Sequence, residues 1–351
     1  MFRSDDIVFL IGAGCSAEAG ISVSNKMRQD LEDLLRTNRE WQPYSDLYNY
    51  VKGAIIQHDC SKGKGCAEPD IERLVITLTE LERHSESLLF PFIGGWCPRL
   101  QQLTKHDFTI VERFRQEIVK QLKAWVMPRD YIRQSSYYGG FFRFANECNY
   151  PLRVFSLNYD LCIEKHSLSD NAVMRGFDPS TRNWNSGLFE PRAEEDSVKI
   201  YLYKMHGSID WERDVSDGRL REVDYCDNPD LIFGIESKMQ SSDPYLFYAY
   251  EFRRYCREAK IIMTLGYSFR DKHITDIIQQ ALQQDLSRKL LVVSNDPTDA
   301  NNYITATATQ LVPHQETAKP FLENLTLDQI MKLTGIKEED LVSTPFLRSD
   351  S

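Results

Sequence analysis

The chain has 351 residues, 42% of them hydrophobic and 27% charged, which is typical of a globular protein with one large domain or two. Its formal net charge of −10 argues against direct nucleic-acid binding across a broad basic face. No apolar run approaches the roughly 20 residues that cross a bilayer, and no cleavable signal precedes the first apolar segment. We therefore expect a cytoplasmic protein that does not bind membranes.

The first element is a short apolar strand, residues 7–11, that runs directly into Gly12-Ala13-Gly14. A continuous apolar run that ends at glycine is typical of a buried parallel strand. The glycines allow a tight turn and the close approach of a ligand. A helix that begins near Ser16 would present its N–H groups and its dipole to a phosphate. The pattern predicts a nucleotide at the first strand–helix turn of an α/β sheet.

Gly12, Gly14 and Ala17 also satisfy the loose dinucleotide fingerprint. A dehydrogenase would place an acid after a second strand, about 20 residues further on. Here the acids within residues 30–33 lie in a segment with helical spacing, 27–35, which argues against hydride transfer.

Residues from about 37 to 148 are expected to form a helical insertion. Apolar and aromatic spacing predicts helices over 71–81, 108–125 and 137–144. Residues 41–66 show a mixed pattern with an exposed loop at 61–65. We interpret the apolar stripes as packing faces without chemistry of their own.

The α/β pattern resumes at residue 152. Strands are predicted over 152–157, 198–205, 231–234, 261–265 and 290–293, the last clear one. Helices are predicted over 245–259 and 274–282, with a short helix after Asp160 and a long loop over 171–196. The expected organisation is one α/β domain with a Rossmann-like parallel sheet, residues 1–317, interrupted by the helical insertion and followed by a helical tail, 318–351.

The eight cysteines are scattered and include no C-x-x-C pair, which excludes a four-cysteine zinc site of the usual spacing. Several fall in expected core segments of a cytoplasmic chain, so we expect reduced thiols. No metal is expected.

Small and polar residues follow the predicted strands. The strand ends are Gly12-Ala13-Gly14, Asn158-Tyr159-Asp160, His206-Gly207-Ser208, Gly266-Tyr267-Ser268 and Ser294-Asn295-Asp296. Open parallel sheets bind ligands at the carboxyl ends of their strands. We therefore expect these residues to build a polar pocket with a glycine floor.

These motifs, in this order, resemble those of the sirtuin superfamily. The matching residues are Gly12-Ala13-Gly14-x-Ser16 with Gly20-Ile21, the N-x-D of Asn158 and Asp160, the H-G of His206 and Gly207, the G-x-S of Gly266 and Ser268, and the late Asn295. The resemblance covers residues 6–21 and 150–297 and implies NAD as the ligand.

The chain departs from the deacylases of that family. Ser22-Val23-Ser24-Asn25 stands where they carry P-x-F-R, and Leu157 replaces the usual glutamine before N-x-D. Only Cys226 lies between Gly207 and Pro229, so we expect the four-cysteine zinc ribbon to be missing. Residues 262–271 and the helical insertion instead resemble the bacterial sirtuin-like NADase effectors of anti-phage defence.

The resemblance implies a role for each matching residue on the nucleotide side. The pyrophosphate of NAD would contact the amides of residues 12–16, with the hydroxyls of Ser16 and Ser268 as further donors. Gly266 would allow close approach at the adenosine side, Asn295 would bind a ribose, and Gly20 belongs to the same opening motif.

On the nicotinamide side, the resemblance implies that Asn158 binds the ribose and positions the attacking water. Asp160 would bind the carboxamide of nicotinamide. His206 would polarise or deprotonate a ribose hydroxyl, which suits its near-neutral titration range.

Each polar candidate also has a structural interpretation. His206 taken alone is more typical of a buried histidine bonded to backbone than of a catalytic residue. Asn158, Asp160 and Ser16 are also typical helix caps. We interpret the other candidates as structural or surface residues: His166, Asp271 and His273.

The first functional hypothesis is an NAD hydrolase that releases nicotinamide and ADP-ribose and is controlled by a partner or trigger. The alternatives are an NAD-dependent protein deacylase, which the missing ribbon disfavours, and a module that senses NAD or ADP-ribose without turnover, which the presence of both Asn158 and His206 disfavours. The resemblance further implies a homo-oligomer and a partner such as a HerA-type hexameric ATPase or an Argonaute-like protein.

Overall fold

A seven-stranded parallel sheet forms the centre of the protein. The computed structural model describes residues 5–63, 66–83, 98–105, 107–166, 172–190, 197–214, 216–233 and 243–337. Within them the strand order is β3-β4-β2-β1-β7-β8-β9, and every neighbouring pair is parallel. The strands are β1 Ile7–Ile11, β2 Leu152–Ser156, β3 Val173–Met174, β4 Ile200–Lys204, β7 Ile261–Leu265, β8 Lys289–Ser294 and β9 Leu311–Gln315. The predicted α/β fold class is confirmed.

The central strand β1 is buried on both faces. Phe9 pairs in register with Val154 of β2 and Met263 of β7. Alternate residues of a strand point to opposite faces, so Phe9 lies in one hydrophobic core and Leu10 in the other. Parallel sheets are covered on both sides, which explains why the strand is a continuous apolar run.

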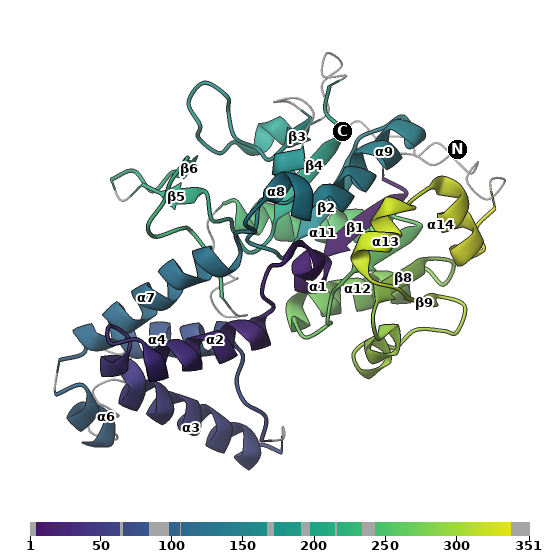
Figure 1. The fold of residues 1–351 in the computed structure, drawn as a ribbon. Coiled ribbons are helices and arrows are strands. Elements are labelled where there is room, and N and C mark those ends of the chain that lie inside the picture. The colour runs from purple at the N-terminus through teal and green to yellow at the C-terminus, as the bar shows by residue number, and fades with distance from the viewer. Residues whose placement is uncertain are drawn as a thin grey trace, which may run out of the picture.

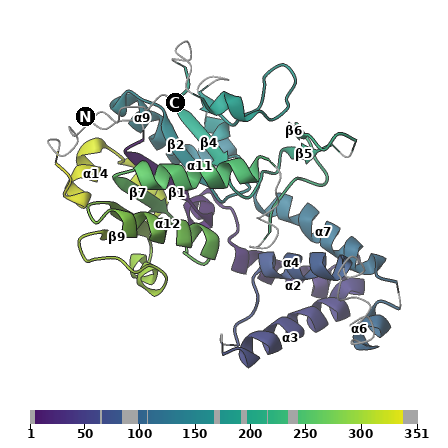
Figure 2. The same ribbon diagram turned by 180° about the vertical axis from the view of Figure 1, so that it is seen from behind.

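Helices cover the two faces of the sheet and extend away from it as a separate lobe (Figure 1). The helices are α1 Ala13–Ser16, α2 Ser24–Thr37, α3 Ser45–Ser61, α4 Ile71–Glu82, α6 Pro98–Leu103, α7 Thr109–Trp125, α8 Tyr131–Gln134, α9 Gly139–Cys148, α11 Tyr245–Glu258, α12 Lys272–Gln284, α13 Ala318–Glu323 and α14 Leu327–Thr334. On one face lie α9 and α13, and on the other α11 and α12, seen in front in Figure 2.

The predicted insertion divides between two places. Its helices α3, α4, α6 and α7 form a helical lobe together with α2, which precedes the predicted insertion (Figure 1). The chain then returns to the sheet through α8 and α9, where Phe141 packs edge-on against Phe9 of β1 at 5.3 Å between ring centroids. The last residues of the predicted insertion therefore belong to the core of the sheet.

Most predicted elements are confirmed, and the errors are concentrated in short or exposed elements. The strand β9 was missed because it lies at the sheet edge, half exposed and interrupted by Pro313. The predicted loop over 171–196 contains β3, and a hairpin of β5 Trp211–Arg213 and β6 Leu220–Glu222 was also missed. In place of the strand over 231–234, Leu231 makes an isolated bridge to Gly207, and residue 234 lies outside the described residues.

Two local predictions were also wrong. Of the segment after Asp160, the described residues 161–166 contain no α-helix and only a 3-10 turn at Glu164–His166. The reduced-thiol expectation fails for Cys60 and Cys66, which form a disulfide between the end of α3 and the segment before α4. Cys97 lies outside the described residues. The five remaining cysteines are free and buried: Cys15, Cys148, Cys162, Cys226 and Cys256.

The part of the chain that the structure describes contains no helix long and apolar enough to cross a membrane. In the expected tail, α13 and α14 pack on α9 and on β8 of the sheet, and residues 338–351 lie outside the described residues.

Candidate functional site

The predicted site residues lie at the carboxyl edge of the sheet, where β1, β2, β4, β7 and β8 all end. They divide into two groups by exposure. Ser16, Asn158, Asp160 and His206 are buried. Around the nucleotide side, Gly12 is buried and Gly266 half-buried, and the rest are exposed: Ala13, Gly14, Gly20, Ser268 and Asn295.

The glycines are required first by the packing of two turns against each other. A Cβ on Gly12 would lie 2.7 Å from the carbonyl oxygen of Gly266, and one on Gly14 would lie 2.9 Å from the Cα of Gly266. Gly266 has a left-handed backbone, and a Cβ there would lie 2.2 Å from the nitrogen of Cys15. The turn after β1 and the turn after β7 therefore contact each other backbone to backbone, which no larger residue allows.

Several amides predicted to hold the pyrophosphate donate to backbone carbonyls within the protein. Gly12 donates to Leu265, Gly14 to Gly266 and Cys15 to Gly12, at 2.9–3.0 Å. The helix that follows is only four residues long, Ala13–Ser16, so it begins earlier and is shorter than expected. Gly20 ends the next 3-10 turn with a left-handed backbone.

Ser16 is the centre of a fully buried hydrogen-bond network. Its Oγ donates to Oδ2 of Asp160 at 2.7 Å and accepts from Nδ2 of Asn158 at 2.9 Å. The hydroxyl of Tyr138 lies 2.7 Å away. Since the single proton of Ser16 goes to Asp160, Tyr138 must be the donor in that contact. Ser16 therefore uses its one proton and two lone pairs within the protein.

Asn158 and Asp160 contact the glycine turn. Nδ2 of Asn158 also donates to the carbonyl of Gly12 at 3.0 Å, and because a carbonyl only accepts, this contact fixes the orientation of the amide. Oδ1 of Asp160 accepts from the amide of Cys162, an Asx turn like the local role expected of a cap. The network places the β2 end directly against the β1 end.

His206 is buried at the end of β4 and contacts a carboxylate. Its Nε2 lies 3.2 Å from Oδ2 of Asp271, and its ring centroid lies 6.3 Å from that of Tyr159. Sequence reasoning interpreted Asp271 as structural or surface. Asp271 does have a structural role, because its side chain caps α12 by accepting from the amide of Ile274. Its contact with His206 was not predicted.

Two tyrosines from the 3-10 turn before α9 complete the buried group. The Tyr137 hydroxyl donates to the carbonyl of Cys15 at 2.6 Å, next to the Tyr138–Ser16 contact. Burial raises the pKa of Tyr138 well above its usual value, so its phenol keeps the proton that it donates. Sequence reasoning noted only that this segment is rich in aromatic residues, a signal that does not identify its partner.

The thiol beside this network is not a nucleophile at neutral pH. Burial raises the pKa of Cys15 to about 12, and only the thiolate form of a cysteine is reactive.

A buried lysine supports the loop that carries Asn158 and Asp160. Lys204, the last residue of β4, donates from Nζ to the carbonyl of Asp160 and lies 3.5 Å from a carboxylate oxygen of Glu164. Glu164 in turn contacts Arg175, which pairs with Asp210 at 2.8 Å. The loop after β2 thus rests on a chain of ion pairs whose side chains are at most 14% exposed.

The adenosine side is more open. Ser268 and Asn295 are exposed at the ends of β7 and β8, and the carbonyl of Asn295 accepts from Nε2 of Gln315 at 3.1 Å. Their predicted contacts with the nucleotide stay predictions, as do the roles assigned to the buried residues.

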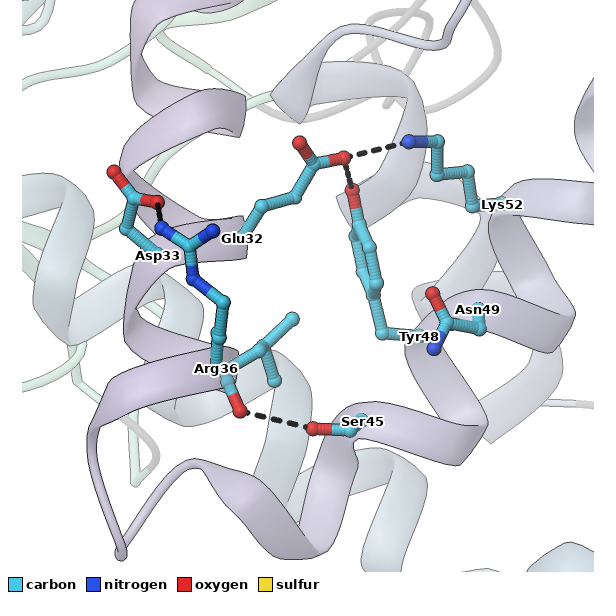
Figure 3. Close-up of a pocket in the computed structure, with 8 residues that line it drawn as sticks. Glu32, Asp33, Arg36, Ser45, Tyr48, Asn49 and Lys52 are labelled. Carbon is cyan, nitrogen blue, oxygen red and sulfur yellow. Dashed lines mark hydrogen bonds and ion pairs between the residues drawn. The ribbon is translucent and has the colours of Figure 1, made fainter.

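A hollow of about 430 Å³ lies elsewhere, between α2 and α3 in the helical lobe (Figure 3). Glu32 accepts there from Tyr48 and Lys52, at 2.5 and 2.6 Å. The hollow contains none of the predicted site residues, and its charges are paired with each other. Among the described residues, no group of three or more His, Cys, Asp or Glu side chains could hold a metal ion.

Comparison with known proteins gives a family match over part of the chain. Residues 152–312 match the family model of the SIR2-like domain. No curated protein matches in sequence. Similar solved structures include a mutant Sir2 homologue in complex with ADP-ribose, at 14% identity over 94% of both chains with a TM-score of 0.44. A Sir2 homologue–NAD complex is also 14% identical, over 93% of this chain and 89% of the other, with a TM-score of 0.44.

Proposed function

We propose that this protein is an NAD⁺ hydrolase that cleaves the bond between nicotinamide and ribose and releases nicotinamide and ADP-ribose. The observation that carries the proposal is the buried network of Ser16, Asn158 and Asp160. It joins two of the strand ends that, together with His206, carry the motifs resembling those of sirtuins. The SIR2-like match over residues 152–312 supports NAD as the ligand.

Nicotinamide leaves from a cationic ring, so the reaction needs orientation of the ribose and stabilisation of an oxocarbenium-like charge more than it needs a strong acid. Asn158 orients the ribose and the attacking water. Asp160 binds the carboxamide of nicotinamide. His206 accepts a hydrogen bond or a proton from a ribose hydroxyl. The exposed Ser268 donates to the pyrophosphate, and Asn295 binds a ribose.

The same proposal extends to the protein's biological role. We infer a cytoplasmic, NAD-depleting effector of anti-phage defence that forms a homo-oligomer and is controlled by a separate protein, such as a HerA-type ATPase or an Argonaute-like protein. The support is the resemblance of residues 262–271 and of the long helical insertion to the bacterial NADase effectors. The helical lobe, which lies away from the sheet (Figure 1), is available for such contacts.

The test is nicotinamide release from NAD by the purified protein, alone and together with the product of a neighbouring gene. Asn158→Ala is expected to lower turnover by about 10²–10⁴-fold, the range of a positioned catalytic side chain. Asn324→Ala is the matched control, because Asn324 is an exposed asparagine at the end of α13.

Two other outcomes would contradict the proposal. NAD binding without cleavage, with or without the partner, would favour a sensing module. Removal of an acyl group from an acyl-lysine peptide, with NAD consumed only when the peptide is present, would favour a deacylase.

A further inference from the structure

We propose that Asp271 is a positioning residue that holds His206 in its working orientation and stabilises the protonated imidazole. The inference rests on the proposed function, since it assigns His206 a partner in that reaction. It concerns a pair of residues that are 65 positions apart in the sequence, on the turns after β4 and β7.

The contact between the two side chains is short and shielded from water. Nε2 of His206 lies 3.2 Å from Oδ2 of Asp271, and the two side chains are only 6% and 9% exposed. Solvent and salt weaken such a pair much less than they weaken an exposed one. A carboxylate at this distance favours the charged form of the imidazole.

The carboxylate of Asp271 is held on its other side. Its Oδ1 accepts from the amide of Ile274 and so caps α12. Its backbone carbonyl accepts from the hydroxyl of Tyr267 and from the amide of Thr275. With Oδ1 and the backbone fixed, Oδ2 is directed at His206.

The turn that carries Asp271 has an unusual backbone. Gly266 and Phe269 are both left-handed, at φ +58°. For a buried phenylalanine this conformation is costly, and such strain persists only where the surrounding structure imposes it. Here the strained turn brings the chain back from the end of β7 so that Asp271 reaches the end of β4.

In many catalytic sites a further side chain orients the general base. His206 and Asp271 have this arrangement, with His206 as the base and Asp271 as the group that orients it. His206 takes the proton from the ribose hydroxyl through a ring nitrogen. Asp271 stays ionised and stabilises the imidazolium that forms. As the bond to nicotinamide breaks and water adds to the ribose, the ribose oxygen regains a proton from that water, and the imidazolium releases its proton to solvent. The phenol of Tyr159 also lies beside the ring; burial raises the pKa of Tyr159 well above its usual value, so its phenol stays neutral.

Asp271→Asn isolates the charge from the structural role. Asparagine caps a helix as well as aspartate does, so α12 keeps its cap. Asp130→Asn is the matched control, because Asp130 also caps a helix, α8, and is exposed. Asp271→Glu keeps the charge, and His206→Ala assigns the His206 signal in the spectra.

Two measurements test the proposal on the full chain. In NMR spectra of protein with ¹⁵N-labelled histidine, the titration midpoint of His206 is expected to fall by about one to three pH units in Asp271→Asn and to stay unchanged in Asp130→Asn. In nicotinamide release, Asp271→Asn is expected to lower kcat by about 10²-fold with a smaller effect on KM. The acid limb of its pH profile is expected to move to lower pH, while Asp271→Glu restores part of kcat.

An unchanged His206 midpoint in Asp271→Asn would overturn the proposal. So would an equal loss of activity in Asp271→Asn and Asp130→Asn, which would indicate a general effect on folding. The spectra require no turnover. If the wild-type protein releases no nicotinamide either alone or with the partner, the proposed function fails, and the titration still decides whether Asp271 and His206 act as a pair.

Discussion

The hydroxyl of Ser16 makes the three hydrogen bonds that a serine can make, to Asp160, Asn158 and Tyr138. The resemblance to sirtuins assigned this hydroxyl to a pyrophosphate. In the structure it holds the β2 end and the turn before α9 against the glycine turn. At the scale of single residues, the site is therefore defined as much by the contacts among its side chains as by the groups that it offers to a ligand.

The pKa of Asp210 likewise depends on the partners of its carboxylate, among them Arg175. Burial alone would raise the pKa of Asp210, but Arg175 at 2.8 Å and a hydrogen bond from Ser208 outweigh it, and the pKa lies below its usual value. A lowered carboxyl pKa contributes stability that is complete above the unfolded-state value, about 3.9, and is lost as the pH falls through the folded-state value.

We predict that Arg175→Met lowers the free energy of unfolding by about 3–5 kcal/mol at pH 7. It leaves the carboxylates of Glu164 and Asp210, which are only 12% and 14% exposed, without their cation. Burial then dominates and Asp210 protonates more readily, so the difference from wild type is expected to shrink as the pH is lowered towards 4. Urea unfolding at several pH values measures both effects.

Arg182→Met is the control for this prediction. Arg182 pairs with Asp224 on the surface, where the two side chains are 47% and 87% exposed. Exposed pairs contribute little, so no measurable change is expected. Equal losses in the two variants would contradict the assigned role of the buried pair.

At the scale of elements, helix α9 shows how closely two segments can approach through one small residue. Gly139 and Gly140 are neighbours at its start, but only Gly140 faces α13. A Cβ on Gly140 would lie 2.0 Å from the carbonyl oxygen of Leu322, whereas one on Gly139 meets nothing nearer than 3.7 Å. The docking of α13 on the sheet therefore depends on Gly140.

We predict opposite effects for the two alanine substitutions. Gly139→Ala is expected to stabilise the protein by up to about 1 kcal/mol, the helix propensity gained over glycine. Gly140→Ala is expected to destabilise it by about 1–3 kcal/mol, because the backbones of α9 and α13 must move apart. Thermal unfolding gives the sign of each change, and faster hydrogen exchange over residues 318–334 would locate the second. A stabilised Gly140→Ala variant would contradict the packing.

At the scale of the whole molecule, the helical lobe and the sheet share one core. The hydrophobic cluster that contains Phe9 of β1 also contains Leu31 of α2, Leu74 of α4 and Phe114 of α7. The lobe extends away from the sheet in both views (Figures 1 and 2), yet no break in buried apolar contact separates the two within the described residues.

We predict that the lobe and the sheet unfold in one cooperative transition. Far-UV circular dichroism reports all helices. Fluorescence of Trp41 and Trp125 reports the lobe once the three other tryptophans, Trp96, Trp184 and Trp211, are replaced by phenylalanine. Coincident transitions are expected, as for a single cooperative unit. Two separate midpoints would show that the lobe folds independently of the sheet.

Local patterns in the sequence were sufficient for the elements whose burial is regular. The apolar run of β1 and the stripes of α4 and α7 repeat with the period of a strand or a helix. The edge strand β9 is half exposed and shows no such repeat. The buried residues of helix α3 do repeat every three or four positions, but one of them is Asp59, and apolar residues such as Ala54 lie on its exposed side, so the pattern is weak in the sequence.

The candidate site likewise has a part that local patterns predicted and a part that they did not. Its glycines and its polar strand ends were predicted from residue types and order, because a parallel sheet gathers the carboxyl ends of its strands at one edge. The partners of those residues were not. Tyr138 reaches Ser16 across 122 positions and Asp271 reaches His206 across 65. These contacts depend on which strands are neighbours and on how each turn bends. Neither the strand order nor the bend of a turn can be predicted from the spacing of residues along the sequence, because both are set when distant segments pack together.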